Sequence, residues 1–354
     1  MSDTFILNGK ETPFKPGQMI LDAVRNGGIE IPTLCYLKGA SPTGACRICL
    51  VEVKGARSLM AACSTPVTPG MDVSTESDLV HQARKLNVEL LLSSGTHNCL
   101  VCEANGNCRL QDLAYFYKIT KLRFKEKEKG DIYPTEDQNP FIVRDFGRCI
   151  LCGRCVQACN EVVVNRAISQ GHRGKRSKIV TGGDGPYNES ECVFCGQCVE
   201  VCPVGALTEK KAKGLGRPWE TTKIRTTCPY CGVGCQQLLH VKDGKIAKVT
   251  AVEDAQPNQG RLCVKGRFAY DFIYSEERLK TPLIREKNGE FREASWDEAL
   301  DLVAAKFQEI IKKDGPDAIA GVSCARSINE DSYQMQKLFR AVIGTNNIDH
   351  CART

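Results

Sequence analysis

The stretch C-I-L-C-G-R-C-V-Q-A-C-N, residues 149–160, decides how this chain folds, because its pattern returns as C-V-F-C-G-Q-C-V-E-V-C-P at residues 192–203. Each run has the spacing C-x2-C-x2-C-x3-C, which places several thiolates on one tight loop around an inorganic iron–sulfur cube. An internal duplication of this kind predicts a pair of 4Fe-4S clusters and a chain that carries electrons.

The fourth cysteine of each run is expected to bind the cluster of the other run, as in two-cluster ferredoxins. One cube is therefore assigned to Cys149, Cys152, Cys155 and Cys202, and the other to Cys192, Cys195, Cys198 and Cys159. Pro203 follows the second run as the pattern requires, whereas Asn160 follows the first. This departure changes only a turn residue.

A third set of cysteines lies toward the N-terminus with the spacing C-x10-C-x2-C-x13-C: Cys35, Cys46, Cys49 and Cys63. A predicted hairpin, residues 4–7 and 11–14 around Asn8-Gly9, and a helix at 19–25 precede it, and a strand at 48–53 accompanies it. Hairpin, helix and cysteine loop follow one another in a β-grasp order. We expect a 2Fe-2S cluster here, with zinc as the alternative.

A fourth set offers only three thiolates, Cys99, Cys102 and Cys108, after a predicted helix at 81–92. The missing ligand must come from elsewhere, and His97 is the nearest candidate because a neutral imidazole binds iron. The alternative is that His97 only donates a hydrogen bond to a cluster sulfur.

A fifth set follows a linker at 213–218 and has the spacing C-x2-C-x3-C-x27-C: Cys228, Cys231, Cys235 and Cys263. It surrounds a predicted hairpin, 238–241 and 246–249. Lys265 stands two positions after the last of these cysteines. A cation there could lie between the cluster and a second redox group as an electron relay, and an ordinary surface lysine is the alternative.

Composition restricts the function classes. Of 21 cysteines in 354 residues, all but Cys324 and Cys351 fall in these sets. The first 14 residues have no secretory or twin-arginine pattern, so we expect a cytoplasmic protein without membrane insertion, in which clustered cysteines bind metal.

The formal charge of +6 falls to roughly −3 once five clusters with anionic thiolates are counted. No nucleic-acid partner is therefore expected, and no G-x-G-x-x-G or Walker sequence offers a nicotinamide or flavin site.

The region from Ser295 onward contains none of the five cysteine sets and has the pattern of regular helices and strands. Ser295 and Glu298 predict a capping box that opens a helix ending near Gly315, followed by a strand at 318–322 and a helix at 331–342. This order begins an α/β domain, with a single clear strand and no edge partner. Cys324 and Cys351 are expected there as small buried hydrophobes.

This order of motifs resembles the N-terminal part of a cytoplasmic molybdenum- or tungsten-dependent formate dehydrogenase catalytic subunit. The region to about residue 207 is similar to the electron-input arm of iron-only hydrogenases and of the large Fe-S subunit of NADH dehydrogenase. The fifth set with Lys265, and S-W-D-E-A-L from Ser295, resemble the bis-pterin oxidoreductases, and G-T-N-N-I-D-H-C-A-R-T, residues 344–354, resembles the formate dehydrogenase segment that leads to the active site. Relatives usually place a cluster-binding histidine where this chain has Gly95.

The resemblance implies a multidomain α+β protein. Its expected parts are a 2Fe-2S ferredoxin-like domain (1–78), a His/Cys3 4Fe-4S segment (79–120), a two-cluster ferredoxin (140–210), a bis-pterin oxidoreductase 4Fe-4S domain (221–277) and the start of a truncated molybdopterin oxidoreductase domain (278–354). The cofactors would be one 2Fe-2S cluster, four 4Fe-4S clusters and, in the complete protein, a molybdenum or tungsten bis(pterin guanine dinucleotide).

The complete enzyme would oxidise formate to CO2 and pass two electrons through partner subunits that bind flavin or NAD(P). The large Fe-S subunit of NADH dehydrogenase and a non-catalytic electron-transfer module are the alternatives. The resemblance also implies that the metal ligand, selenocysteine or cysteine, follows Thr354 directly. We therefore expect an in-frame UGA codon at that point and no activity in this chain alone.

Overall fold

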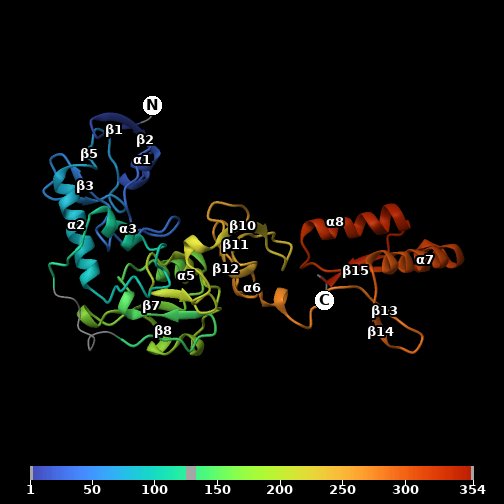
Figure 1. Ribbon diagram of the computed structural model, residues 1–354. Helices are drawn as coiled ribbons and strands as arrows, with labels where there is room; N and C mark the ends of the chain where they lie inside the picture. Colours follow the sequence, from blue (N-terminus) through green and yellow to red (C-terminus); the bar gives the residue numbers. More distant parts are fainter. Residues whose placement is uncertain (1–2, 125–132, 352–354) are drawn as a thin grey trace. The chain divides into compact units, whose positions relative to one another are not determined.

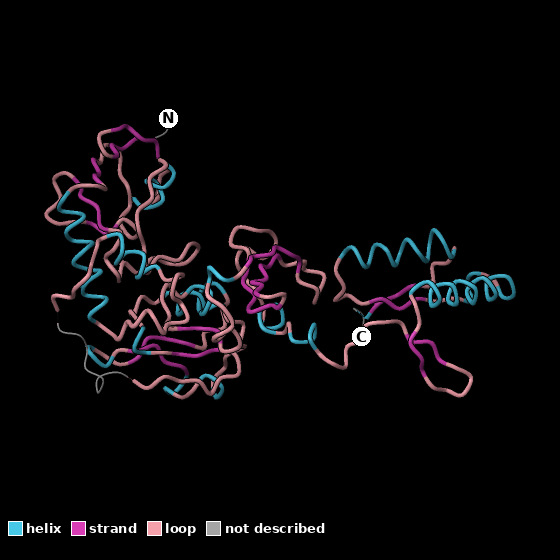
Figure 2. The backbone as a smooth tube through the Cα atoms, viewed as in Figure 1, coloured by secondary structure: helices cyan, strands magenta, loops and turns pink. Residues whose placement is uncertain are grey.

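The computed structural model describes residues 3–124 and 133–351. The chain divides into two compact units, Met1–Thr222 with His240–Lys248, and Lys223–Leu239 with Val249–Thr354. Figure 1 gives the order of the elements from the blue N-terminus to the red C-terminus, and Figure 2 shows that loops make up much of the cysteine-rich region. Among the described residues, no helix has both the length and the apolar character needed to cross a bilayer. Residues 352–354, the last of the G-T-N-N-I-D-H-C-A-R-T segment, lie outside the described part.

The N-terminal domain has the expected β-grasp order. Its sheet has the order β2-β1-β5-β3-β4, with β1 parallel to β5. The predicted hairpin is confirmed, and Asn8 and Gly9 both have positive φ (49° and 83°), as a tight two-residue turn requires. The elements are β1 (Asp3–Leu7), β2 (Lys10–Phe14), α1 (Ile20–Asn26), β3 (Leu50–Val53), β4 (Met60–Ala61) and β5 (Asp72–Ser74).

Two helices carry the chain through the next segment, α2 (Asp78–Ser93) and α3 (Arg109–Phe116). The Ser77 hydroxyl caps α2 by accepting a hydrogen bond from the Val80 amide at 3.4 Å. Arg84 of α2 is buried and donates to the Leu50 carbonyl at 3.1 and 2.7 Å. This pair of bonds fixes α2 against the β-grasp sheet.

The duplicated cysteine runs fold alike. In each run a glycine with positive φ, Gly153 (75°) or Gly196 (71°), opens a short helix that carries the third cysteine. Glycine is required there because a side chain is strained in the left-handed region. The elements are α4 (Arg154–Gln157) and α5 (Gln197–Val201), with the strand pairs β6 (Ile142–Arg144) with β9 (Leu207–Glu209) and β7 (Ile168–Gly171) with β8 (Lys178–Thr181).

A three-stranded sheet of order β10-β11-β12 contains the hairpin predicted after the third cysteine of the fifth set. The turn residues Asp243 and Gly244 have positive φ of 50° and 75°. The elements are β10 (Thr222–Thr227), β11 (Gln236–Lys242) and β12 (Lys245–Ala251), followed by α6 (Val264–Phe268), β13 (Leu283–Arg285) and β14 (Phe291–Glu293).

The last elements are α7 (Trp296–Asp314), β15 (Gly321–Ser323), α8 (Asn329–Lys337), which continues as a π-helix over Leu338–Ile343, and β16 (Ile348–His350). Three expectations were wrong here. Only half of the capping box forms, because Ser295 accepts from the Glu298 amide while the Glu298 carboxylate pairs with Arg292. The expected strand begins later, at Gly321, after a 3-10 turn. It also has an edge partner, because β16 pairs with it in parallel.

Candidate iron–sulfur cluster sites

The thiols of the third set converge in the β-grasp domain, where all four cysteines are buried: Cys35, Cys46, Cys49 and Cys63. Hydrogen bonds from Cys46 and Cys63 lower the pKa of Cys35 below its usual range, and a bond from Cys63 lowers the pKa of Cys49 to about 7. The same bonds, and then burial, raise the pKa of the donors Cys46 and Cys63. Four sulfurs that already share protons fit a metal cluster, which replaces those protons by iron.

Two members of the fourth set line a cavity of about 450 Å³ together with the candidate histidine. Cys99, Cys108 and His97 face this cavity, and the Cys99 thiol lies 3.7 Å from the His97 carbonyl. Cys102 is the third member: its charge acts on both other cysteines. Two sulfurs and an imidazole therefore face one space, and the Cys102 thiol is near enough to act electrostatically on both sulfurs.

Arg148 supplies a cation beside Cys102. Burial alone would lower the pKa of Arg148, but its bond to Asp145 at 2.8 Å and the attraction of the Cys102 thiolate raise it instead. The sulfur of Cys102 also lies against Gly205, where an added Cβ would come within 2.4 Å of it. Cys102 is therefore held between a charged group and the backbone that follows Cys202.

Gly95 has no space for a side chain. A Cβ at this position would lie 2.1 Å from the Gly147 carbonyl oxygen, and the neighbouring Thr96 amide donates to the same oxygen at 2.8 Å. The imidazole Nε2 of His97 lies 3.2 Å from the same Cβ position. His97 thus occupies the space beside Gly95, and its role as iron ligand stays a prediction.

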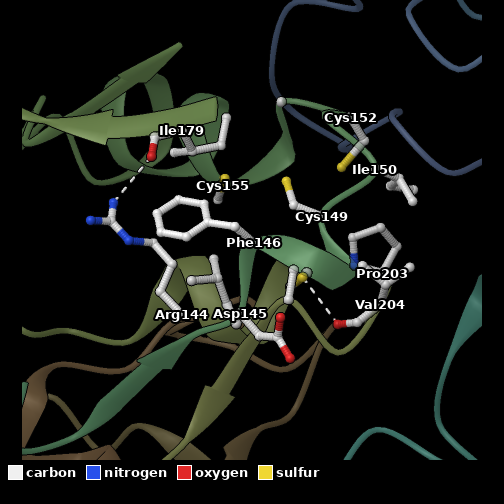
Figure 3. Close-up of a pocket in the computed structure, with 14 residues that line it drawn as sticks. Arg144, Asp145, Phe146, Cys149, Ile150, Cys152, Cys155, Ile179, Pro203 and Val204 are labelled. Atoms are coloured by element: carbon white, nitrogen blue, oxygen red, sulfur yellow. Dashed lines mark hydrogen bonds between the residues drawn. The ribbon is translucent and has the colours of Figure 1, made fainter. Parts of the chain in front are cut away.

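One pocket gathers the members of the first crossed set, Cys149, Cys152, Cys155 and Cys202. Figure 3 shows the labelled sulfurs of Cys149, Cys152 and Cys155 around this pocket with Phe146 and Ile150. Burial is the largest cause that raises the pKa of Cys152, to about 12. A buried anion needs a compensating cation, so iron suits this apolar pocket better than free thiolates do.

A second pocket gathers the other crossed set, Cys159, Cys192, Cys195 and Cys198. Backbone amides point at its sulfurs: Ala167 donates to Cys159 at 3.3 Å and Phe194 donates to Cys192 at 3.4 Å. Each pocket thus takes three cysteines from one run and the fourth cysteine from the other run, the arrangement that crossed ligation requires.

Members of three different sets share one hydrophobic core in the first unit. This core includes Cys35 and Cys46 of the third set and Cys152 of the first cube, and Cys108, Cys149 and Cys202 pack against it. A second link joins the β-grasp loop to the other cube, because Glu161, close to Cys159, accepts from the Ser41 amide at 2.7 Å. These four sites therefore belong to one packed body.

The fifth set lies in the second unit. Its four cysteines interact electrostatically, and the Cys228 amide donates to the Cys235 carbonyl at 2.8 Å. Cys263 directly precedes α6, and Lys265 lies in the first turn of this helix with an exposed side chain. The structure thus places Lys265 beside the set, and its relay role stays a prediction.

Two polar side chains near the cubes were missed by sequence reasoning. Arg144 is 3% exposed and lies over the rings of Phe146 and Tyr187, 4.8 and 4.6 Å from their centroids. The Tyr187 hydroxyl donates to the Cys198 sulfur at 3.9 Å. Burial raises the pKa of Tyr187, so the phenol stays a neutral donor. Only tertiary contacts bring these groups to the cluster loops, and the local sequence carries no signal for them.

The prediction that Cys324 and Cys351 are buried was wrong, because both side chains are exposed. Their sulfurs lie 3.6 Å apart at the ends of β15 and β16. The pairing of two strands far apart in the sequence, which local periodicity does not reveal, brings them together.

Comparison with known families matches the order of these sites. The matching family descriptions are a 2Fe-2S iron-sulfur cluster binding domain (4–78), the NADH-ubiquinone oxidoreductase-G iron-sulfur binding region (84–123), the ferredoxin-like domain of NADH-quinone oxidoreductase subunit 3 (139–208), the molybdopterin oxidoreductase Fe4S4 domain (221–275) and molybdopterin oxidoreductase (278–354). The chain therefore belongs to the molybdopterin oxidoreductases that carry an N-terminal series of iron–sulfur domains, and the predicted domain order is confirmed.

Within this class the chain is similar to two kinds of protein. It is 40% identical to the NADPH-Fe(3+) oxidoreductase subunit alpha of Geobacter sulfurreducens (strain DL-1 / KN400), over 98% of this chain and 40% of that protein. It is 36% identical to a protein of Staphylococcus aureus (strain USA300) that is provisionally named a formate dehydrogenase, over 98% of this chain and 39% of that protein. The chain thus spans about 40% of the length of these curated relatives.

A solved structure supports the fold of more than half of the chain. A chain of a NAD+-reducing [NiFe]-hydrogenase in the H2-reduced state is similar with a TM-score of 0.57 and 33% identity, over 61% of this chain and 91% of that chain. Together with the family matches, this similarity identifies an iron–sulfur electron-transfer module of molybdopterin oxidoreductase type that binds 2Fe-2S and 4Fe-4S clusters.

Proposed function

We propose that this chain is the electron-transfer part of a formate dehydrogenase. In the longer protein, a molybdenum or tungsten bis-pterin cofactor would oxidise formate to CO2, and this chain would carry the two electrons to partners that bind flavin or NAD(P). The segment at 344–354, which resembles the formate dehydrogenase segment, and the 36% identical relative support this substrate.

The observation that carries the electron-transfer role is the shared core of the first unit. Cysteines of the 2Fe-2S set, the His/Cys set and the first cube pack against the same apolar side chains, and the loop between Cys35 and Cys46 bonds to Glu161 beside the second cube. We propose that the first cube passes electrons to both the 2Fe-2S and the His/Cys clusters. The apolar core excludes water from this route, and excluding water helps to set cluster potentials.

The first test measures iron, acid-labile sulfide and zinc in the anaerobically purified chain. One 2Fe-2S and four 4Fe-4S clusters require about 18 iron atoms per chain, and EPR of the reduced protein should resolve distinct signals. Stoichiometric zinc with little iron would refute the cluster assignment.

The second test addresses the substrate and uses the longer protein that contains this chain. Formate added anaerobically should reduce the clusters and generate their EPR signals, while NADPH without a partner subunit should not. Full iron content with no reduction by formate would reject formate and leave the electron-transfer role intact.

The 40% identity to the alpha subunit of an NADPH-Fe(3+) oxidoreductase supports a second candidate. In that case the clusters would receive electrons that originate from NADPH through a partner subunit. Cluster reduction by NADPH only in the presence of that partner, with no response to formate, would favour this alternative.

A further inference from the structure

Cys324 and Cys351 form a pair of thiols outside every cluster set. Their sulfurs are 3.6 Å apart, in hydrogen-bonding contact, and both side chains are exposed. The two residues are 27 positions apart in the sequence. A contact this close therefore depends on the folded pairing of β15 with β16.

The backbone around the pair suits a disulfide. The last paired residues of the two parallel strands are Ser323 and His350, and each cysteine directly follows the end of its strand. Neighbouring strands lie about 4.8 Å apart, within the Cα separation of roughly 4.4–6.8 Å that a disulfide needs. The sulfurs therefore require only side-chain rotation, not movement of the strands, to reach bonding distance.

The two sides of this strand pair differ. Gly321 packs so closely on the Phe339 ring that an added Cβ would lie 2.5 Å from it. Val322 is 83% exposed, and alternation along a strand places residue 324 on the side of residue 322. The thiol pair is thus on the open side, where a small molecule in solution can reach it.

The Cys351 sulfur has surroundings that favour the nucleophilic thiolate. The Ala325 amide donates to the Cys351 sulfur and lowers the pKa of this thiol, with further contributions from Cys324 and from the positive charge of Arg326. The Arg326 amide donates to the Cys324 sulfur at 3.4 Å. Amide donors and a nearby cation favour the thiolate, which is the nucleophile in exchange reactions.

We propose that Cys324 and Cys351 form a redox-active dithiol site that exchanges with low-molecular-weight disulfides such as oxidised glutathione. The Cys351 thiolate attacks one sulfur of the small disulfide, forms a mixed disulfide and releases the first thiol. Cys324 then loses its proton and attacks the Cys351 sulfur, which forms the intramolecular disulfide and releases the second thiol. The protein thiols lose two electrons, and the small disulfide gains both.

Peptide mapping of the intact chain tests this site. The anaerobically purified, cluster-loaded chain is incubated with oxidised glutathione, alkylated before unfolding and digested with trypsin without reductant. Trypsin releases Cys324 in peptide 314–326 and Cys351 in peptide 341–353, each with a single cysteine. We expect the two peptides to be linked and to separate after dithiothreitol treatment. The linked form should exceed singly modified peptides roughly tenfold or more, because the second step is intramolecular.

Two variants separate the steps. In Cys324→Ser the second step is blocked, so Cys351 should keep the glutathione adduct. In Cys351→Ser the thiol that attacks first is absent. The remaining thiol, Cys324, should therefore form its glutathione adduct more slowly than Cys351 does. Iron content measured before and after treatment controls for damage to the cluster sets.

The wild-type protein alone decides the outcome, even if a variant folds poorly. Peptides 314–326 and 341–353 that stay unlinked, whether alkylated or carrying separate glutathione adducts, would overturn the proposal while iron content remains constant. Because this readout involves neither formate nor the pterin, it is independent of the proposed function.

Discussion

Replacement of Gly205 by alanine tests whether the Cys102 sulfur is fixed on a cluster. The new Cβ would lie 2.4 Å from this sulfur and 3.3 Å from the Ala104 Cβ, whereas ordinary contacts begin at 3.4 Å. The Cys102 sulfur must therefore move by about 1 Å, the difference between 2.4 Å and the 3.4 Å of an ordinary contact. Gly205 has no positive φ, so alanine strains nothing in the backbone itself.

The cost depends on whether Cys102 is bound to iron. A sulfur without a ligand bond can rotate to another staggered position, whereas a sulfur on iron cannot leave without breaking its bond. Overpacking of this kind costs about 1–3 kcal/mol. This cost corresponds to a roughly fivefold to hundredfold lower affinity for the cluster. The cluster-free protein should keep nearly all of its stability.

Iron analysis and EPR measure this effect. Gly205→Ala should lose about four iron atoms per chain and the signal of the His/Cys cluster, while the other signals remain. Gly182→Ala is the matched control, because a Cβ at Gly182 meets no atom within 4 Å and its φ is not positive. Full iron and unchanged spectra in Gly205→Ala would refute ligation by Cys102 in the observed position.

Four further changes probe other contacts. Tyr187→Phe removes the hydrogen bond to Cys198 and should lower the potential of that cube by roughly 40 mV in an EPR redox titration, because the lost bond contributes about 1 kcal/mol; an unchanged potential would exclude the bond. Ser295→Ala removes the cap of α7 and should cost about 1 kcal/mol in urea unfolding, with Ser295→Thr as the control that keeps the cap. His97→Cys should retain the cluster and lower its potential, because a thiolate adds negative charge; an identical spectrum would place the fourth ligand elsewhere. Lys265→Ala, in the longer protein, should slow cluster reduction by formate without loss of iron, and full activity would make Lys265 an ordinary surface residue.

The fold could be predicted wherever short-range chemistry decides the conformation. Asn8-Gly9 needs a backbone with positive φ, and the hairpin around it forms as expected. The strand β16 was missed because it has three residues and pairs with a strand that lies far away in the sequence. Alternation over three residues is too short to distinguish a strand from a loop.

In the candidate sites, too, the parts set by local sequence could be predicted and the parts set by tertiary packing could not. Cysteine spacing reflects the reach of adjacent ligands around one cluster, so the sets could be assigned from local sequence. The charged side chains and hydrogen-bond donors around these cysteine sets could not be predicted from local sequence. Arg144 reaches the cubes from β6, and Arg148 approaches Cys102 only because two cysteine runs pack together. Such contacts depend on tertiary packing, which leaves no periodic signal in the sequence.

Gly95 shows how one local departure follows from packing between two sites. The Gly147 carbonyl accepts from the Thr96 amide at 2.8 Å and leaves no space for a side chain at position 95. Gly147 lies two residues before Cys149 of the first cube, so a larger residue at 95 would push the His/Cys loop away from that cube. The absence of histidine at position 95 therefore permits close packing between two cluster loops. His97, which faces the same cavity as Cys99, is the imidazole that this packing leaves available.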